Sequence, residues 1–267
     1  MSERKESDIG KIPIDWATTE FESICEFITD GSHYSPKPEK SSYFMASVKD
    51  MRYNHFDFSD CKTISKNDFE FLVNNNCNPQ NGDILLSKDG ANCLDLIFVY
   101  KQPEKIVLLS SIAIARLKEG FDADFYRYFL LSPNAQFLMR NQFISGSAIP
   151  RVVLKDFKRI IVPNIKINEQ LAIASILSSL DDKIDLLNRQ NKTLEQLAET
   201  LFRQWFVVEA DESWENKPLK EVCEIINGFA FKSEDYSTNG RVIIRTMITR
   251  NSYNLFILLM EALWMYL

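Results

Sequence analysis

One stretch of the sequence, from Asn168 to Phe206, constrains the fold more than any other, because its apolar residues alternate at spacings of three and four. Such a repeat is typical of a coiled-coil seam, in which the a and d positions of each heptad face a partner helix. No Gly or Pro interrupts the stretch, so it predicts one long helix, on the order of 50 Å at ~1.5 Å per residue. The predicted interface consists of Leu180, Ile184, Leu187, Asn191, Leu194, Ala198 and Leu201, and the stripe continues at Leu177 and Trp205.

Two arrangements would bury this stripe: the helix packs on its own domain, or it pairs with another helix. A seam of two positions in seven is narrower than the core-facing side of a globular helix usually is. Asn191 inside the seam resembles the polar residue that fixes the register of a coiled coil. The pattern therefore favours helix pairing over a core helix.

Composition indicates a globular chain without a membrane segment. The net charge of −6 over 267 residues argues against general coating of nucleic acid, but it allows a locally basic face. The N-terminus has no apolar core of the signal-peptide kind, and the run from Leu255 to Leu267 is too short to span a bilayer. The five cysteines form no C-x-x-C pair and only two histidines accompany them. We therefore expect no zinc site and a reducing, cytoplasmic location.

Taken in order, the chain predicts an α+β domain over residues 1–165, with a β core and peripheral helices, followed by the long helix at 166–207. Apolar residues at 19–28 have helical spacings, and 30–38 is a turn-rich loop. Residues 121–143 predict helix, which Pro133 either breaks or opens anew. The predicted strands are 43–48, 71–73, 83–87, 94–100, 105–109 and 159–163.

The chain repeats itself after the long helix. With an offset of 198, the pattern of residues 16–28 recurs at 214–226. We interpret this as internal duplication, with residues 208–267 forming the truncated start of a second domain of the same kind. Chance similarity over a short stretch is the other interpretation.

Three segments together resemble the specificity subunit of type I DNA restriction-modification systems, over essentially the full chain. They are GKIPIDW with the downstream DGSHYSP, the strand and turn GDILLSKDG, and GSAIPRVVLKDFKRIIVP with the long helix after it. In that family, two target-recognition domains are held apart by antiparallel pairing of two such helices, and each domain reads one half of a split DNA site. With one recognition domain, one helix and the start of a second domain, this sequence resembles a truncated, half-length member.

The resemblance implies double-stranded DNA as the ligand and methyltransferase and restriction subunits as partners. It implies no cofactor in this chain; S-adenosylmethionine, ATP and Mg are expected only in the partner subunits. The long helix would form a homodimer or pair with another specificity chain. If two copies pair in antiparallel fashion, the two-fold axis requires an inverted repeat in the DNA.

Apart from the resemblance, the residues of several loops also indicate that the chain binds DNA. Residues 140–159 carry five Lys or Arg and one Asp, a local charge of +4 (5 − 1). A positive edge of this kind neutralises phosphates, while polar side chains on loops read base edges. The expected DNA-binding residues are His33, Tyr34, Lys37, Ser87, Lys88, Asn92, Ser147, Arg151 and Lys155.

The sequence offers no catalytic constellation beside these features. Asn78-Pro79-Gln80 is not the N-P-P-aromatic motif of amino-methyltransferases, and no glycine-rich cofactor loop follows a strand. Asp181, Asp182 and Lys183 lie on the long helix and are expected on its solvent face. The favoured function is a non-enzymatic DNA-specificity subunit. The alternative is an inactive remnant or scaffold that docks partners through its helix without productive DNA recognition.

Overall fold

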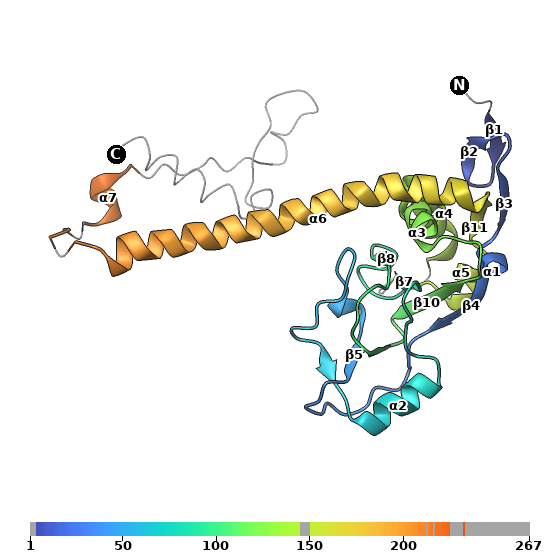
Figure 1. Ribbon diagram of the computed structural model, residues 1–267, viewed down its shortest axis with the longest axis horizontal. Coiled ribbons are helices and arrows are strands. Elements are labelled where there is room, and N and C mark those ends of the chain that lie inside the picture. The colour runs from blue at the N-terminus through green and yellow to red at the C-terminus, as the bar shows by residue number, and fades with distance from the viewer. Residues whose placement is uncertain (1–3, 145–149, 212, 216, 225–231, 233–267) are drawn as a thin grey trace. The chain divides into compact units, whose positions relative to one another are not determined.

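The computed structural model describes residues 4–144, 150–211, 213–215, 217–224 and 232. The chain divides into two compact units, Met1–Thr200 and Leu201–Leu267 (Figure 1). The elements ahead of the long helix are β1 (Arg4–Ser7), β2 (Gly10–Pro13), β3 (Ala17–Glu20), α1 (Phe21–Ile24), β4 (Cys25–Asp30), β5 (Phe44–Ala46), η1 (Val48–Asp50), β6 (Lys62–Thr63), α2 (Lys66–Asn74), β7 (Ile84–Ser87), β8 (Ile97–Val99), β9 (Ile106–Leu108), β10 (Ile112–Leu117), α3 (Ala123–Leu131), α4 (Pro133–Phe143), α5 (Leu154–Lys158) and β11 (Ile161–Asn164). The long helix α6 (Ile167–Arg203) is followed by the π-helical segment η2 (Gln204–Val208) and by α7 (Leu219–Val222).

The centre of the first unit is a four-stranded antiparallel sheet with the strand order β4-β10-β7-β8. Successive residues of β7 enter different apolar clusters: Ile84 and Leu86 lie in one, and Leu85 lies in the other. Because side chains alternate between the two faces and both faces are buried, the strand is a continuous apolar run in the sequence. The sheet is therefore the core of the domain.

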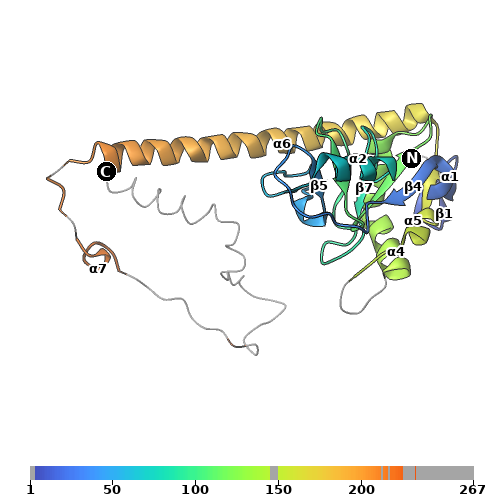
Figure 2. The ribbon, with the colours of Figure 1, turned by 90° about the horizontal axis from the view of Figure 1, so that it is seen from below.

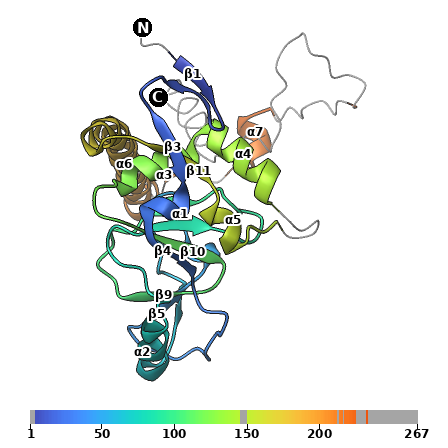
Figure 3. The ribbon, with the colours of Figure 1, turned by 90° about the vertical axis from the view of Figure 1, so that its right-hand side faces the viewer.

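Helices and smaller sheets cover the two faces of this central sheet. The cluster that contains Ile84 includes residues of α3, α4 and α5, whereas the cluster that contains Leu85 includes residues of β5 and β9. Figure 3 shows these layers from top to bottom, with α3 above β4 and β10, then β9 and β5, and finally α2. β5 pairs in parallel with β9 and in antiparallel with β6.

A buried ion pair ties the start of β7 to β10. Asp83, almost wholly buried, accepts hydrogen bonds from Nε and Nη2 of Arg116, both at 2.8 Å. A third bond, from the backbone N of Gln80 at 2.7 Å, completes its shell. The ion pair and the hydrogen bonds offset the free-energy cost of removing the carboxylate from water.

The pairing of β11 with β3 decides where the long helix begins. The two strands are antiparallel, with Ile161 opposite Glu20 and Asn164 opposite Ala17. This pairing returns the end of the domain to its first strands, so α6 begins beside them and then runs along the domain (Figure 2).

The predicted fold class is confirmed: a β core with peripheral helices precedes a long helix. Strands occur in five of the six predicted segments, and Pro133 opens α4. Two assignments were wrong. Residues 71–73 belong to helix α2, whose Ser65 cap accepts a hydrogen bond from the backbone N of Asp68. Residues 25–28 belong to strand β4, because pairing with β10 overrides their helical spacing.

Two short helices occur at positions related by the offset of the predicted duplication. Helix α7 begins at Leu219 and ends at Val222, which are the positions of α1 (Phe21 and Ile24) shifted by the offset of 198. In both places the helix ends before an extended cysteine. The domain boundaries at 165 and 207 stay predictions, and most of 208–267 lies outside the described residues.

Candidate nucleic-acid interface

Three loops of the domain meet at the turn between β9 and β10. The backbone N of Ser110 donates to the carbonyl of Ser32 at 3.0 Å, and the carbonyl of Ser111 accepts from the backbone N of Lys88 at 3.0 Å. The hydroxyl of Ser111 accepts from the backbone N of Val48 at 3.3 Å. The loops that follow β4, β5 and β7 are therefore fixed to one another.

A fourth segment, the residues before α5, joins this cluster through backbone pairing. Gly90 N donates to the carbonyl of Pro150 at 3.0 Å, and Val152 N donates to the carbonyl of Lys88 at 2.9 Å. These bonds flank an antiparallel bridge between Asp89 and Arg151. The SKDG motif and residues 150–152 thus lie side by side, although about sixty residues separate them.

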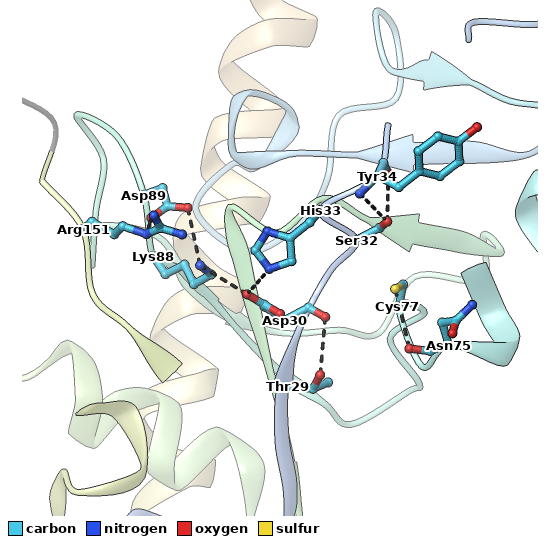
Figure 4. Close-up of polar contacts among 10 residues, drawn as sticks. All are labelled: Thr29, Asp30, Ser32, His33, Tyr34, Asn75, Cys77, Lys88, Asp89 and Arg151. Carbon is cyan, nitrogen blue, oxygen red and sulfur yellow. Dashed lines mark hydrogen bonds and ion pairs between the residues drawn. The ribbon is translucent and has the colours of Figure 1, made fainter. Parts of the chain in front are cut away.

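A chain of charged and polar side chains crosses the cluster (Figure 4). The carboxylate of Asp30 lies between Nε2 of His33 at 3.6 Å and Nζ of Lys88 at 3.3 Å. Lys88 also lies 3.5 Å from Asp89, whose other oxygen is 3.0 Å from Nε of Arg151. The side chain of Lys88 is only 2% exposed, so the two carboxylates compensate a buried cation.

The loop after β4 presents His33 and Tyr34 on a fixed backbone. The hydroxyl of Ser32 donates to the carbonyl of Tyr34 at 2.8 Å and accepts from its backbone N at 3.0 Å. A Cβ at Gly31 would lie 2.3 Å from the carbonyl oxygen of Leu108, so only glycine fits there. His33 and Tyr34 are both exposed, and the ring of Tyr34 points away from the charged chain (Figure 4).

The structure separates the predicted DNA-binding residues into two groups. Six are exposed on the loops and on α5: His33, Tyr34, Lys37, Asn92, Arg151 and Lys155. Ser147 lies outside the described residues. The expectation that Ser87 and Lys88 contact DNA is corrected, because both side chains are buried. The hydroxyl of Ser87 donates to the carbonyl of Asn92 at 2.6 Å and accepts from Leu96 N at 3.1 Å, so it holds the loop together.

The predicted positive edge is largely neutralised by carboxylates that are distant in the sequence. Arg140 pairs with Asp95 and Lys158 pairs with Glu22, both at 2.7 Å. Arg151 pairs with Asp89, and Arg159 lies 3.9 Å from Asp156. Lys155 makes no ion pair within the described residues.

Counting charges along the sequence misses these partners, so the local charge of +4 does not form a net positive patch. Exposed pairs of this kind contribute only ~0–1 kcal/mol and can be exchanged for contacts with phosphate.

Sequence reasoning missed the turn between Met51 and Phe56, which pair as an antiparallel bridge. The backbone N of Arg52 donates to the carbonyl of His55 at 2.8 Å, which closes the turn. All four residues of the turn, Arg52, Tyr53, Asn54 and His55, are exposed. The signal was present: four side chains with hydrogen-bonding groups stand between two apolar residues.

A second missed feature anchors α6 to the domain, and we call these four residues the Asp181 clasp: Tyr53, Arg127, Tyr128 and Asp181. Asp181 accepts hydrogen bonds from Nη1 of Arg127 at 2.7 Å, from the Tyr128 hydroxyl at 2.8 Å and from the Tyr53 hydroxyl at 3.2 Å. The prediction that Asp181 faces solvent was wrong. Burial raises the pKa of this carboxyl, but the bonds from Arg127 and Tyr128 outweigh burial and hold the pKa below its usual value.

The first turn of α6 has its own anchors. Nε1 of Trp16 donates to Glu169 at 2.9 Å. Gln170 is completely buried, where its amide accepts from Asp122 N and donates to the carbonyl of Ile165, both at 2.8 Å. Together with the Asp181 clasp, these bonds fix the N-terminal part of the helix on the domain.

From Leu180 onward the predicted seam has no cover within the described residues. The exposed fractions of Leu180, Leu187 and Leu194 are 57%, 44% and 61%. Ile184 and Leu201 are exposed as well, as is Asn191, whereas Ala198 is half-buried. The stripe therefore does not serve as a core face of its own domain.

Two buried cysteines of the domain are protonated at neutral pH. Burial raises the pKa of the Cys25 thiol to about 12 and that of Cys93 to about 11, so both remain protonated at neutral pH. Nowhere in the described ranges do three or more His, Cys, Asp or Glu side chains gather in a way that could hold a metal ion. None of the helices in that part of the chain is both long enough and apolar enough to cross a membrane.

Comparison with known proteins identifies a family and several relatives of this chain. The family model described as "Type I restriction modification DNA specificity domain" matches residues 13–196. The MjaVIII specificity subunit of Methanocaldococcus jannaschii is 31% identical over 185 residues, which cover 64% of this chain and 41% of that subunit. The MjaIX specificity subunit of the same organism is 25% identical over 278 residues, 90% of this chain and 59% of the relative.

A solved structure shares the fold. The crystal structure of the type I restriction-modification system S subunit from M. genitalium has a TM-score of 0.52 and 19% sequence identity, covering 85% of this chain and 58% of that one. The chain thus spans between two fifths and three fifths of the length of these proteins. Since the family model covers well over half of the sequence, the chain belongs to the type I restriction-modification DNA specificity domain family.

Proposed function

We propose that this chain is a sequence-specific DNA-binding specificity subunit, in which the N-terminal domain reads one half-site and α6 pairs with a second such helix while a methyltransferase subunit docks. The observation that carries the proposal is the exposed seam on an anchored helix. Leu180, Leu187 and Leu194 are about half exposed, and burying a leucine side chain contributes ~1.5–3 kcal/mol. A partner helix is the occupant that fits a stripe of two positions in seven.

The loop cluster supports the reading part of the proposal. Its exposed side chains include an imidazole, a phenol, an amide and a guanidinium, on His33, Tyr34, Asn92 and Arg151. These are the groups that bond to base edges and phosphates. His33, Tyr34 and Asn92 project from loops whose backbones are held by hydrogen bonds to Ser110 and Ser111, and Arg151 lies on a segment bonded to the backbones of Lys88 and Gly90. Such preorganisation reduces the entropy lost on binding.

The chain contributes recognition and not chemistry in this proposal. Methylation and cleavage belong to the methyltransferase and restriction subunits, and S-adenosylmethionine, ATP and Mg bind there. If the second helix comes from another copy of this chain, identical domains face each other across a two-fold axis. The DNA site is then an inverted repeat with a fixed spacer. If it comes from a different specificity chain, the two half-sites differ.

The test is a DNA-binding assay with the full chain and its methyltransferase subunit, together with methylome sequencing of cells in which this chain is the sole specificity subunit. We expect a split, symmetric methylated motif, and we expect duplexes with that motif to be retarded while scrambled duplexes are not. Stable docking of the methyltransferase subunit without any sequence preference would contradict the proposal and would favour the scaffold alternative. A non-symmetric motif would contradict only the pairing of identical copies.

A further inference from the structure

The four residues of the turn Arg52–His55 are exposed, and hydrogen bonds hold the backbone on which they stand. Its flanking residue Phe56 is buried, and both backbone groups of Phe56 bond to the amide of Gln102: N to Oε1 at 2.6 Å and the carbonyl to Nε2 at 3.0 Å. The side chain of Arg52 pairs with Asp57 at 2.8 Å. The four tip residues therefore stand on a rigid base.

The turn is placed between the loop cluster and the long helix. Its segment leaves the cluster at Val48, which bonds to Ser111. At the tip, the Tyr53 hydroxyl bonds to Asp181 of α6 at 3.2 Å, and the Tyr53 ring lies 5.2 Å from the guanidinium carbon of Arg127. Tyr53 thus locks the turn to the helix, while the next two side chains remain exposed.

These two side chains form a polar pair. Nδ1 of His55 lies 2.7 Å from Oδ1 of Asn54, which orients the asparagine amide. Within the described residues this is the one hydrogen bond that either side chain makes. The amide N–H groups of Asn54 and Nε2 of His55 are left to meet a ligand. These N–H groups can donate to N7 of a purine in the major groove, and the second lone pair of Oδ1 can accept from N6 of adenine, so the amide still matches the edge of that base.

We infer that the turn Arg52–His55 is a base-contacting element, in which Asn54 reads a base edge of duplex DNA and His55 holds the amide in place. This inference rests on the proposed function and adds to it the residue that determines part of the sequence preference. Because the turn is locked to α6 through Tyr53, the base pair that it reads keeps a fixed position relative to the helix, whichever bases the other loops contact.

The experiment selects bound duplexes from a random DNA library, using the full chain with its methyltransferase subunit, and compares wild type with Asn54→Ala and His55→Gln. Asn74→Ala is the matched control, because Asn74 is an exposed asparagine on α2 without a hydrogen bond from its side chain within the described residues. We expect Asn54→Ala to lower affinity for the selected site roughly tenfold and to relax the preference at one or two adjacent base pairs, the size typical of one lost base contact. We expect His55→Gln to have a smaller effect at the same positions and Asn74→Ala to have none.

Three results overturn the inference. An unchanged preference at every position in Asn54→Ala shows that the turn does not read bases. An equal loss of affinity for all sequences shows a phosphate contact instead. If wild type selects no sequence at all, the proposed function fails as well, which distinguishes that failure from a failure of the inference alone. Melting temperatures of all variants, expected to equal that of wild type, exclude loss of folding as the cause.

Discussion

At the scale of single residues, the most consequential contact joins Asp181 to Arg127. The side chain of Arg127 is 5% exposed, and its charge is compensated by one carboxylate and by the rings of Tyr53 and Tyr128, 5.2 and 4.8 Å away. Its Nη2 has no hydrogen bond among the described residues. Removal of the Asp181 charge therefore leaves a buried cation with no anionic partner.

Asp181→Asn should destabilise the domain by about 2 kcal/mol or more. The pKa of Asp181 is lowered in the folded chain, so its stabilisation is complete above the pKa of the unfolded chain and is lost as pH falls through the folded value. Melting temperatures should fall more steeply below about pH 4 in wild type than in the variant. Asp182→Asn, at the exposed neighbouring position, is the control and should behave as wild type. Equal acid sensitivity in all three proteins would contradict the role of the Asp181 clasp.

The sequence alone could not reveal these residue contacts. Asp181 and Arg127 are 54 positions apart, and no local pattern distinguishes Asp181 from its exposed neighbour Asp182. Ser87 and Lys88 were misjudged for a similar reason: their loop reads as polar and exposed, but its side chains turn inward to Asp30 and to the carbonyl of Asn92. Exposure of single side chains depends on partners that are brought together only by folding.

At the scale of elements, prediction succeeded where the signal is local. The heptad pattern of α6 and the capping signal of Pro133 depend on neighbours within a few residues. At β4 the prediction of a helix was wrong, and no strand was predicted at β10. Both segments owe their strand character to pairing with each other across about ninety residues. The contacts of α6 with the domain lie between its first turn and Asp181, whereas its seam is exposed from Leu180 onward.

Replacing Leu187 and Leu194 together with Asp should abolish helix pairing, because two charges would be desolvated in the seam. We expect the dissociation constant of the assembly to rise at least about 100-fold, measured by sedimentation. The control pair Thr193→Asp and Gln196→Asp adds the same charge away from the seam. An unchanged oligomer in the Leu variant would show that the seam is not an interface.

At the scale of the whole molecule, the proposed function assigns base reading to the domain and spacing to the helix. Insertion of one heptad, a second copy of residues 184–190, lengthens α6 by ~10.5 Å. In an antiparallel pair of two copies this lengthening corresponds to about three base pairs at ~3.4 Å each. The methylated motif should gain a spacer longer by about that amount while the half-site bases stay the same. Altered half-site bases would show that the helix and the domain do not act independently.

The placement of the Asp181 clasp gives α6 the mechanics of a lever. Thr200 lies 19 residues beyond Asp181 (200 − 181), a distance of about 28 Å along the helix. A tilt of roughly 7° at the clasp displaces that point by ~3.4 Å, the rise of one base pair. In the proposed assembly, the stiffness of the Asp181 clasp and of the first-turn anchors of α6 would therefore set how accurately the spacing between the two half-sites is fixed.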